Sequence, residues 1–345
     1  MINFHFLTQM HSNRPKGLYI LDQEHLKTVY APREQEEIAS LVDIDVPPQT
    51  STSVGQNPSL LKEVEFIFSG WGAPIMDEPF LMAAPKLRAV FYAAGSIRCF
   101  TTEAFWKRGI RVTCASAVNA QPVAEYTLGA ILLSLKHFWR HAANAKANKW
   151  RPADLRQACP GAYRSTIGLV SFGMIARKTL ELLRPFDLQC IVYCPLLTEE
   201  EARSLNVESR SLEEVFQQSD VISLHTPHLP ETRGMITGRH FALMKHGATF
   251  INTARGIIVR EEDLINILRQ RPDLTAILDV TWPEPPSKDS ALPGLPNVVL
   301  TPHIAGSMGN ECGRMGRFMV DELRRYLNGM PMEGEVTQEL ATLLA

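Results

Sequence analysis

Hydrophobic and polar positions alternate in two successive blocks along the chain. Between residues 17 and 114, segments with helical spacing separate short runs rich in β-branched and aromatic residues, GLYIL, VEFIF, LRAVFYA and IRVTC. The helical segments are REQEEIASLV, EPFLMAA and TEAFWKR. Strands that alternate with helices predict an α/β layer built on a parallel sheet.

The second block repeats this alternation more sharply after residue 160. Its six strand candidates are residues 166–170, 189–193, 221–225, 249–252, 276–279 and 298–300. One of the intervening helices, SLEEVFQQS, has a capping box formed by Ser211 and Glu214. Six such strands predict a doubly wound sheet.

Three further segments have their own patterns. Residues 121–150 carry apolar side chains at helical spacing and predict one long helix, with Pro122 in its first turn. The aromatic end of this helix could belong to the core or to a subunit interface. Residues 47–58 are rich in Pro, Ser, Thr and Gln and predict a surface loop, whereas residues 314–327 form an amphipathic helix that could pack onto the first domain.

Composition limits the classes of function. A chain of 345 residues is long enough for about two domains, and 45% hydrophobic with 21% charged residues is typical of a soluble globular protein. The formal net charge is -2, so no excess of Lys and Arg indicates a nucleic-acid partner. We therefore expect a small-molecule ligand, with no nucleic acid and no membrane as partner.

The cysteines and the N-terminal segment bear on location. The six cysteines lack CxxC spacing, which favours neither a disulfide framework nor a metal site and fits a reducing cytoplasm. The opening residues MINFHFLTQMHSNRPKG have no apolar core of a signal peptide, and the longest apolar run is too short to span a bilayer. We expect a cytoplasmic protein.

The segment TIGLVSFGMIA, residues 166–176, resembles a dinucleotide-binding turn with one glycine missing. The glycine positions of the G-x-G-x-x-G pattern are occupied by Ser171, Gly173 and Ala176. Gly173 stands where the backbone approaches a pyrophosphate, and Ala is accepted in the third position. Ser171 departs from the pattern, at a cost if the turn needs a positive φ. By itself this segment also fits an ordinary strand, turn and helix.

The next strand ends where such folds place an acid on the cofactor ribose. Cys194 occupies that position, and it could equally be a small packing residue. The acidic run at residues 199–201 would repel a 2′-phosphate, so the sequence favours NAD over NADP.

Polar residues follow three later strands, in FINTARGIIV, ILDVTWPEPP and NVVLTPHIAG. They are Arg255, Glu284 and His303, and each lies where open α/β sheets bind ligands. Taken singly, each has an ordinary alternative: a surface salt bridge for Arg255, a solvated charge for Glu284 and a structural role for His303.

With SLHTPHLPETRGMI and QPVAEYTLGAILL, this ordered series closely resembles the NAD(P)-dependent D-2-hydroxyacid dehydrogenases over about residues 87–306. The resemblance implies two Rossmann-like α/β domains with doubly wound parallel sheets. An NAD-binding domain, 119–306, would be inserted into a flavodoxin-like substrate domain, 1–118 and 307–345. It also implies a homodimer built largely on residues 122–150.

The resemblance further implies reversible hydride transfer between the nicotinamide and C2 of a 2-hydroxy or 2-oxo acid. His303 would be the acid and base, because imidazole titrates near neutral pH. Glu284 would orient its ring and favour the imidazolium, and Arg255 would bind the substrate carboxylate or polarise its carbonyl. Candidate substrates are phosphoglycerate, glycerate, hydroxypyruvate and glyoxylate.

Other site residues follow from the same resemblance. Asp279 would face the nicotinamide carboxamide, and Gly95 would belong to a substrate loop in FYAAGSIRCF. Arg98 falls outside the family's pattern and could bind a second anionic group or be solvated. The full cofactor set is Ser171, Gly173, Met174, Ile175, Cys194, Thr226, Pro227, Thr232, Thr253, Ala254, Arg255, Asp279, His303, Ala305 and Gly306; the substrate set is Ala94, Gly95, Ser96 and Arg255.

Two alternatives remain open at this level. The family includes corepressor-like scaffolds that sense NAD and keep the same three polar residues. A degenerate dehydrogenase could also have lost cofactor affinity through Ser171 and Cys194.

Overall fold

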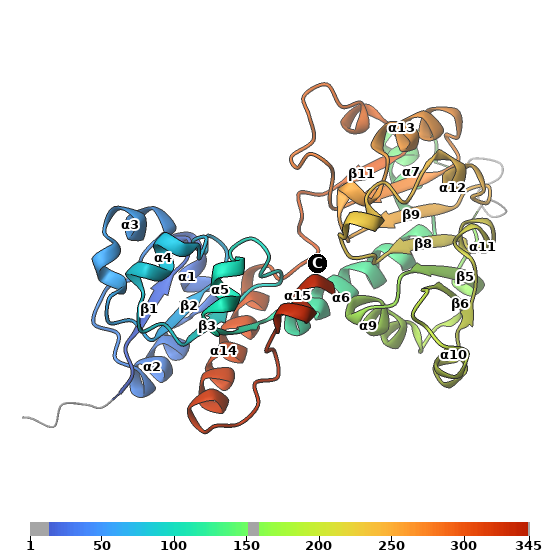
Figure 1. Cartoon of the computed structure of the whole chain (residues 1–345). Coiled ribbons are helices and arrows are strands. Elements are labelled where there is room, and N and C mark those ends of the chain that lie inside the picture. The colour runs from blue at the N-terminus through green and yellow to red at the C-terminus, as the bar shows by residue number, and fades with distance from the viewer. Residues whose placement is uncertain (1–13, 151–158, 344–345) are drawn as a thin grey trace, which may run out of the picture. The chain divides into compact units, whose positions relative to one another are not determined.

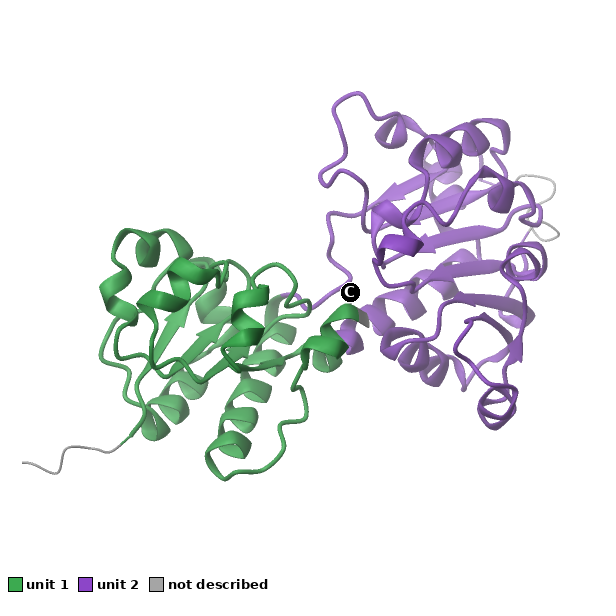
Figure 2. Ribbon diagram, in the orientation of Figure 1, with its two compact units in different colours: residues 1–118, 309–342 green, residues 119–308, 343–345 purple. Residues whose placement is uncertain are grey.

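The computed structural model describes residues 14–150 and 159–343, so most of the N-terminal stretch discussed above lies outside the described residues. The chain divides into two compact units, residues 1–118 with 309–342 and residues 119–308 with 343–345 (Figure 2). Within the described part, no helix is long and apolar enough to cross a membrane.

The first unit contains a parallel sheet of four strands in the order β1-β2-β3-β4 (Figure 1). The strands are β1 (Gly17–Ile20), β2 (Phe66–Ser69), β3 (Ala89–Tyr92) and β4 (Arg111–Cys114). Residues 43–49 lie on the outer side of β1, where parallel bridges join Lys16 to Asp43 and Ile20 to Gln49. Counting this segment, the order becomes 2-1-3-4-5, the flavodoxin-like arrangement.

Helices cover the sheet of the first unit because its strands are apolar on both faces. The helices are α1 (Gln23–Val29), α2 (Pro32–Leu41), α3 (Ser51–Gln56), α4 (Glu78–Ala83), α5 (Glu103–Lys107), α14 (Cys312–Leu327) and α15 (Gln338–Leu343). Phe66, Phe68 and Phe91 pack with α1, α2 and the buried face of α14 in one core cluster. The expectation that the C-terminal amphipathic helix packs onto the first domain is confirmed.

The second unit contains seven parallel strands in the order β11-β10-β9-β8-β5-β6-β7. They are β5 (Tyr163–Val170), β6 (Asp187–Tyr193), β7 (Glu208–Ser209), β8 (Val221–Leu224), β9 (Thr249–Asn252), β10 (Thr275–Leu278) and β11 (Val298–Leu300). The order reverses between β5 and β8, as in a Rossmann fold. The predicted fold class, two α/β units with doubly wound parallel sheets, is therefore confirmed; the two-residue strand β7 was not predicted.

Two separate cores cover the two faces of this sheet. One contains side chains of α11 (Leu212–Gln218), α12 (Gly238–Ala242) and α13 (Glu261–Gln270). The other contains side chains of α6 (Ser116–Ser134), α9 (Met174–Leu183) and α10 (Glu199–Leu205). The central strands β8 and β9, and nearly all of β10, are buried on both faces, which explains their continuous apolar runs.

The predictions for residues 121–150 and 47–58 were wrong in detail. The long helix expected over residues 121–150 is two helices, α6 and α7 (Phe138–Lys146), because His137 has a left-handed φ of 47° that ends regular winding. Pro122 is not in the first turn, since α6 begins at Ser116. The expected loop at residues 47–58 contains α3, whose start is stabilised by a capping box between Thr50 and Ser53.

Candidate active site

The polar residues expected to carry chemistry follow the strands of the second unit's sheet. All seven strands are parallel, so their carboxyl ends meet at one edge. Loops after β5, β6, β8, β9, β10 and β11 therefore line the same edge, where open α/β sheets bind their ligands.

The turn after β5 has the shape of a dinucleotide-binding turn despite its missing glycine. Ser171 has a φ of 73°, a conformation that glycine adopts without strain. A methyl group at Gly173 would meet no atom within 4 Å, which leaves the backbone open to a ligand. Ala176 is fully buried at the helix–strand contact. The turn and the amides at the start of α9 thus fit a pyrophosphate.

Met174 and Ile175 form the first turn of α9, after the Gly173 cap. At the end of β6, Cys194 is partly buried and packs beside the core under α9 and α10. Nearby, Arg177 of α9 pairs with Glu201 of α10 at 2.8 Å, so one of the three acidic residues is already neutralised. Cys194 offers no carboxylate to a ribose hydroxyl.

The loop after β8 is held together by its own polar groups. The Thr232 hydroxyl donates to the Pro227 carbonyl at 2.7 Å and accepts from the Leu229 amide at 2.9 Å. Its role here is to shape the loop. Thr226 and His225 are buried, and the His225 amide donates to Val170 of β5 at 2.9 Å, which fastens this loop to the phosphate turn.

Arg255 lies in a tightly braced turn after β9. The buried Asn252 side chain accepts from the Ala254 amide at 3.0 Å and donates to the Arg255 carbonyl at 3.1 Å. A methyl group at Gly256 would fall 2.0 Å from the Thr281 backbone, so only glycine lets these two loops meet. Thr253 is buried beside this turn, with its hydroxyl 3.5 Å from that of Thr127.

Asp279, directly after β10, holds the loop that carries His303. One carboxylate oxygen accepts from the Thr301 hydroxyl at 2.6 Å and from the Ile304 amide at 2.8 Å. The other accepts from the Ala305 amide at 2.9 Å. The carboxylate is buried and shared among these three donors.

His303 and Glu284 form a direct pair. The ring Nδ1 lies 2.7 Å from Oε1 of Glu284, and both side chains are partly exposed to solvent. His303 has a φ of 56°, and its amide donates to the Asp279 carbonyl at 2.9 Å. The contact to Nδ1 leaves Nε2 as the ring atom available to a ligand.

Arg255 is electrostatically linked to this pair. Burial lowers the pKa of its guanidinium, and the charge of Glu284 acts in the opposite direction. The structure thus brings the three predicted residues to one edge of one unit. A fixed cation, a general acid or base and its orienting carboxylate can bind an anion and move a proton there.

The predicted substrate loop lies in the first unit, after β3. Ala94 is buried and Gly95 and Ser96 are partly exposed. Arg98 is not directed at an open anion site, because its guanidinium donates to the carbonyls of Ala341 at 3.0 Å and Thr342 at 2.7 Å, at the end of α15.

Several residues that shape the site were missed from the sequence. They are Asn252 at the end of β9, Gly256 and Thr301 in the loops, Tyr126, whose hydroxyl lies 2.9 Å from that of Thr301, and Asn119, which accepts from the Ser307 amide beside Gly306. Gly70 after β2 lies beside Ala93, next to the substrate loop. A polar or glycine residue at the last position of a strand, or directly after it, was the available signal for Asn252, Thr301 and Gly70.

Comparison with known proteins agrees with this geometry. Residues 128–305 match the family model described as D-isomer specific 2-hydroxyacid dehydrogenase, NAD binding domain. The solved structure of D-lactate dehydrogenase from Aquifex aeolicus, complexed with NAD and lactic acid, matches with a TM-score of 0.70 and 25% identity, over 91% of this chain and 96% of that one.

Curated relatives match over shorter stretches. A 2-hydroxyacid dehydrogenase of Bacillus subtilis, YoaD, is 35% identical over 65% of this chain and 66% of its own length. The (S)-sulfolactate dehydrogenase of Chromohalobacter salexigens is 34% identical over 73% of this chain and 81% of its own. The matched stretch spans 42% to 48% of the D-3-phosphoglycerate dehydrogenases of several organisms.

The family model covers about half of the chain, and its residues coincide with the unit whose turn fits a pyrophosphate. The chain belongs to the family of D-isomer-specific 2-hydroxyacid dehydrogenases, NAD-dependent oxidoreductases, and residues 128–305 are its NAD-binding domain.

Proposed function

We propose that this protein transfers a hydride between C2 of a 2-hydroxy or 2-oxo acid and the nicotinamide of NAD, with Arg255, Glu284 and His303 as its reactive group. The observation that carries the proposal is the 2.7 Å contact between His303 and Glu284, on loops at the same sheet edge as Arg255. When bound, NAD supplies the hydride chemistry, and the protein supplies alignment and charge.

Each residue has a role that its contacts support. The Arg255 guanidinium binds the substrate carboxylate, because a planar cation suits a bidentate anion. The Nε2 atom of His303 takes the hydroxyl proton when the hydroxy acid is oxidised and returns it when the oxo acid is reduced. Glu284 holds Nδ1 and so fixes the ring during both directions. Asp279 keeps the His303 loop in place through its three bonds.

The substrate carries a carboxylate next to the reacting carbon, and its remaining groups are the finer part of the proposal. The amides of Gly95 and Ser96 in the first unit are further donors to an acid, with Ala94 beside them. We place phosphoglycerate, glycerate, hydroxypyruvate and glyoxylate in the first set of candidates. Sulfolactate and lactate join them because relatives that match this chain bear those names.

The cofactor is NAD and not NADP in this proposal. Glu199 and Glu200 begin α10 just beyond Cys194, and their charges oppose a 2′-phosphate. We further propose a cytoplasmic homodimer in which α6 and α7 meet a second copy. Exposed Phe138 and Leu133 on these helices support that interface.

A substrate screen tests the proposal. NADH and NADPH oxidation is followed with each 2-oxo acid, and NAD reduction with each 2-hydroxy acid, for the wild type and for His303→Ala. We expect turnover with NADH and at least one acid, and a loss of about 100-fold or more in the variant. Tight NADH binding without turnover of any acid would favour the scaffold alternative. Millimolar dissociation constants for both cofactors would favour a degenerate dehydrogenase.

A further inference from the structure

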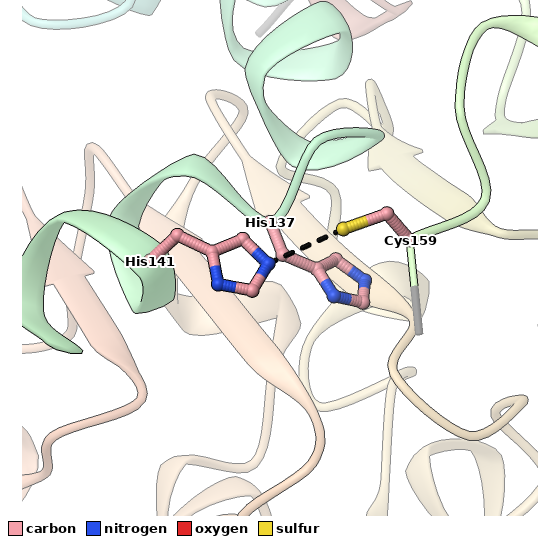
Figure 3. A group of neighbouring side chains, drawn as sticks. All are labelled: His137, His141 and Cys159. Atoms are coloured by element: carbon pink, nitrogen blue, oxygen red, sulfur yellow. Dashed lines mark hydrogen bonds between the residues drawn. The ribbon is translucent and has the colours of Figure 1, made fainter. Parts of the chain in front are cut away.

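Three potential metal ligands converge at the junction of α6 and α7, in the NAD-binding unit (Figure 3). His137 occupies the left-handed position between the two helices, and His141 follows one turn later on α7. Cys159 comes from the chain segment that leads into β5. One donor atom from each of the three residues lies within 4.8 Å of the other two.

The His137 ring is the unusual member of this group. His137 is only 6% exposed, and neither of its ring nitrogens has a hydrogen-bond partner among the described residues. A neutral imidazole always carries one lone pair and one N–H, so this burial leaves both without compensation. Such buried polar atoms are rare and call for an explanation, of which an absent ion is one.

Burial lowers the pKa of His137, and the nearby charges of Arg140 and His141 lower it further. The Gly247 backbone acts in the opposite sense, although it does not reach hydrogen-bonding geometry with the ring, and His246 lowers the pKa slightly.

The other two ligands already contact each other. Nε2 of His141 lies 3.3 Å from Sγ of Cys159, and the thiol also lies 3.6 Å from the Lys136 carbonyl. Figure 3 shows the two imidazole rings side by side, with the thiol next to them. Nδ1 of His141 is buried and has no partner among the described residues.

We propose that His137, His141 and Cys159 form a binding site for a zinc ion, separate from the proposed reaction centre. Zinc takes imidazole nitrogen and thiolate sulfur in tetrahedral sites with metal–ligand bonds of about 2.0–2.3 Å, which sets donor atoms about 3.3–3.6 Å apart. The contact between His141 and Cys159 already has this spacing. The widest separation in the group must shorten by about 1 Å. A water molecule completes the tetrahedron.

Zinc binding displaces one proton. The Cys159 thiol loses its proton to solvent as the zinc–sulfur bond forms, while both imidazoles bind as neutral ligands, so one proton is released for each zinc ion. The thiolate offsets one of the two charges of zinc, so the site gains one net positive charge near Arg140, whose guanidinium also donates to the Asp273 carbonyl. The bound ion ties the α6–α7 junction to the chain segment that enters β5.

Zinc titration of the EDTA-treated full chain tests this site without any cofactor or substrate, so its result does not depend on the proposed function. A chromophoric zinc chelator reports affinity, and mass spectrometry under native conditions reports stoichiometry. We expect one zinc ion per chain and at least 100-fold weaker binding in Cys159→Ser and His141→Gln. His141 and Cys159 are both partly exposed, so these changes leave the core intact. Co²⁺ should give a thiolate charge-transfer band that Cys159→Ser lacks.

Cys99→Ser is the matched control, because Cys99 is an exposed cysteine in the first unit. This variant should bind zinc like the wild type, and zinc should raise the Tm of both. Circular dichroism of each variant verifies that it is folded. Equal zinc affinity in folded Cys159→Ser and the wild type would overturn the proposal. So would zinc binding that Cys99→Ser abolishes, since the ion would then lie elsewhere.

Discussion

Glu284 places its carboxylate oxygen 2.7 Å from Nδ1 of His303, so the orientation of the imidazole depends on a residue from a different loop. Replacing Glu284 with Gln keeps the size of the side chain and removes its charge. We expect kcat to fall by about 10- to 100-fold, because the ring loses its preferred tautomer and orientation. KM should change little, since Arg255 still binds the substrate carboxylate. Steady-state kinetics with the substrate found by the screen measures both quantities.

A matched control for this change is Glu262→Gln, which removes an acidic charge from the first turn of α13. It should leave kcat within about twofold. A Glu284→Gln enzyme with wild-type kcat would show that His303 does not need this partner.

We expect the buried Asp279 carboxylate to contribute to the stability of the fold, because it accepts three hydrogen bonds from the His303 loop. Asp279→Asn replaces an oxygen that accepts from the Ala305 amide with an NH2 group, so two donors face each other. We expect the unfolding free energy to fall by about 1–3 kcal/mol and kcat to fall with it, because the His303 loop loosens. Urea unfolding and kinetics check the two effects. Asp289→Asn changes an exposed residue nearby in the sequence, and it should lower neither the unfolding free energy nor kcat.

Replacing each of two glycines beside the site with alanine should have different effects on stability and on NADH binding. Gly256→Ala puts a methyl group 2.0 Å from the Thr281 backbone, so we expect a loss of about 1–3 kcal/mol in stability. Gly173→Ala adds a methyl group where no protein atom lies within 4 Å, so stability should be unchanged. NADH binding by this variant should weaken at least tenfold, because the methyl group takes the space of the pyrophosphate. Fluorescence titration with NADH and urea unfolding separate the two cases.

Ser171 holds the turn after β5 at a φ of 73°, which costs a non-glycine residue roughly 1–2 kcal/mol. Ser171→Gly removes this strain. Glycine also raises the conformational entropy of the unfolded chain, which lowers the stability by about 0.5–1 kcal/mol. The net expectation is a stabilisation of up to about 1.5 kcal/mol, measured by urea unfolding. Ser171→Ala keeps the strain and serves as control. A glycine variant less stable than the alanine variant would contradict this account of the turn.

The positions of most strands in the second unit were predictable because each is a short apolar run followed closely by a polar or glycine residue. The pattern gives β5, β6, β8, β9, β10 and β11 within a few residues. Strand β7 has only two residues, both exposed, so it has no hydrophobic signal. The break between α6 and α7 was missed for a related reason: the apolar spacing continues through His137, and only its backbone conformation interrupts the helix.

The sequence indicated residues of the candidate site but not the contacts among them. Arg255, Glu284 and His303 stand out because each follows a strand, in a sequence motif that resembles the corresponding motif of the family. The bond between Asp279 and the His303 loop joins residues far apart in sequence, and no local pattern indicates it. The group of His137, His141 and Cys159 was missed because its spacing matches no common metal motif and the cysteine lies 18 residues beyond His141 in the sequence.

We expect His225 to make the stability of the fold depend on pH. It is buried directly after β8, and burial lowers its pKa to about 4 from an ordinary value near 6.5. Between these two values the unfolded chain binds a proton that the folded chain does not, so unfolding becomes easier as the pH falls from 6.5 towards 4. The full effect corresponds to about 3 kcal/mol.

Urea unfolding at pH 7.0 and 5.0 measures this contribution, with fluorescence as the readout. At the lower pH the wild type should lose part of the 3 kcal/mol, and a His225→Asn variant should lose less, because its side chain does not titrate. His246→Asn is the matched control, since that histidine is exposed and its removal should leave the pH dependence of the wild type in place. If His225→Asn loses as much stability as the wild type over this interval, groups other than His225 cause the effect. The His225 ring would then bind protons equally in the folded and the unfolded chain.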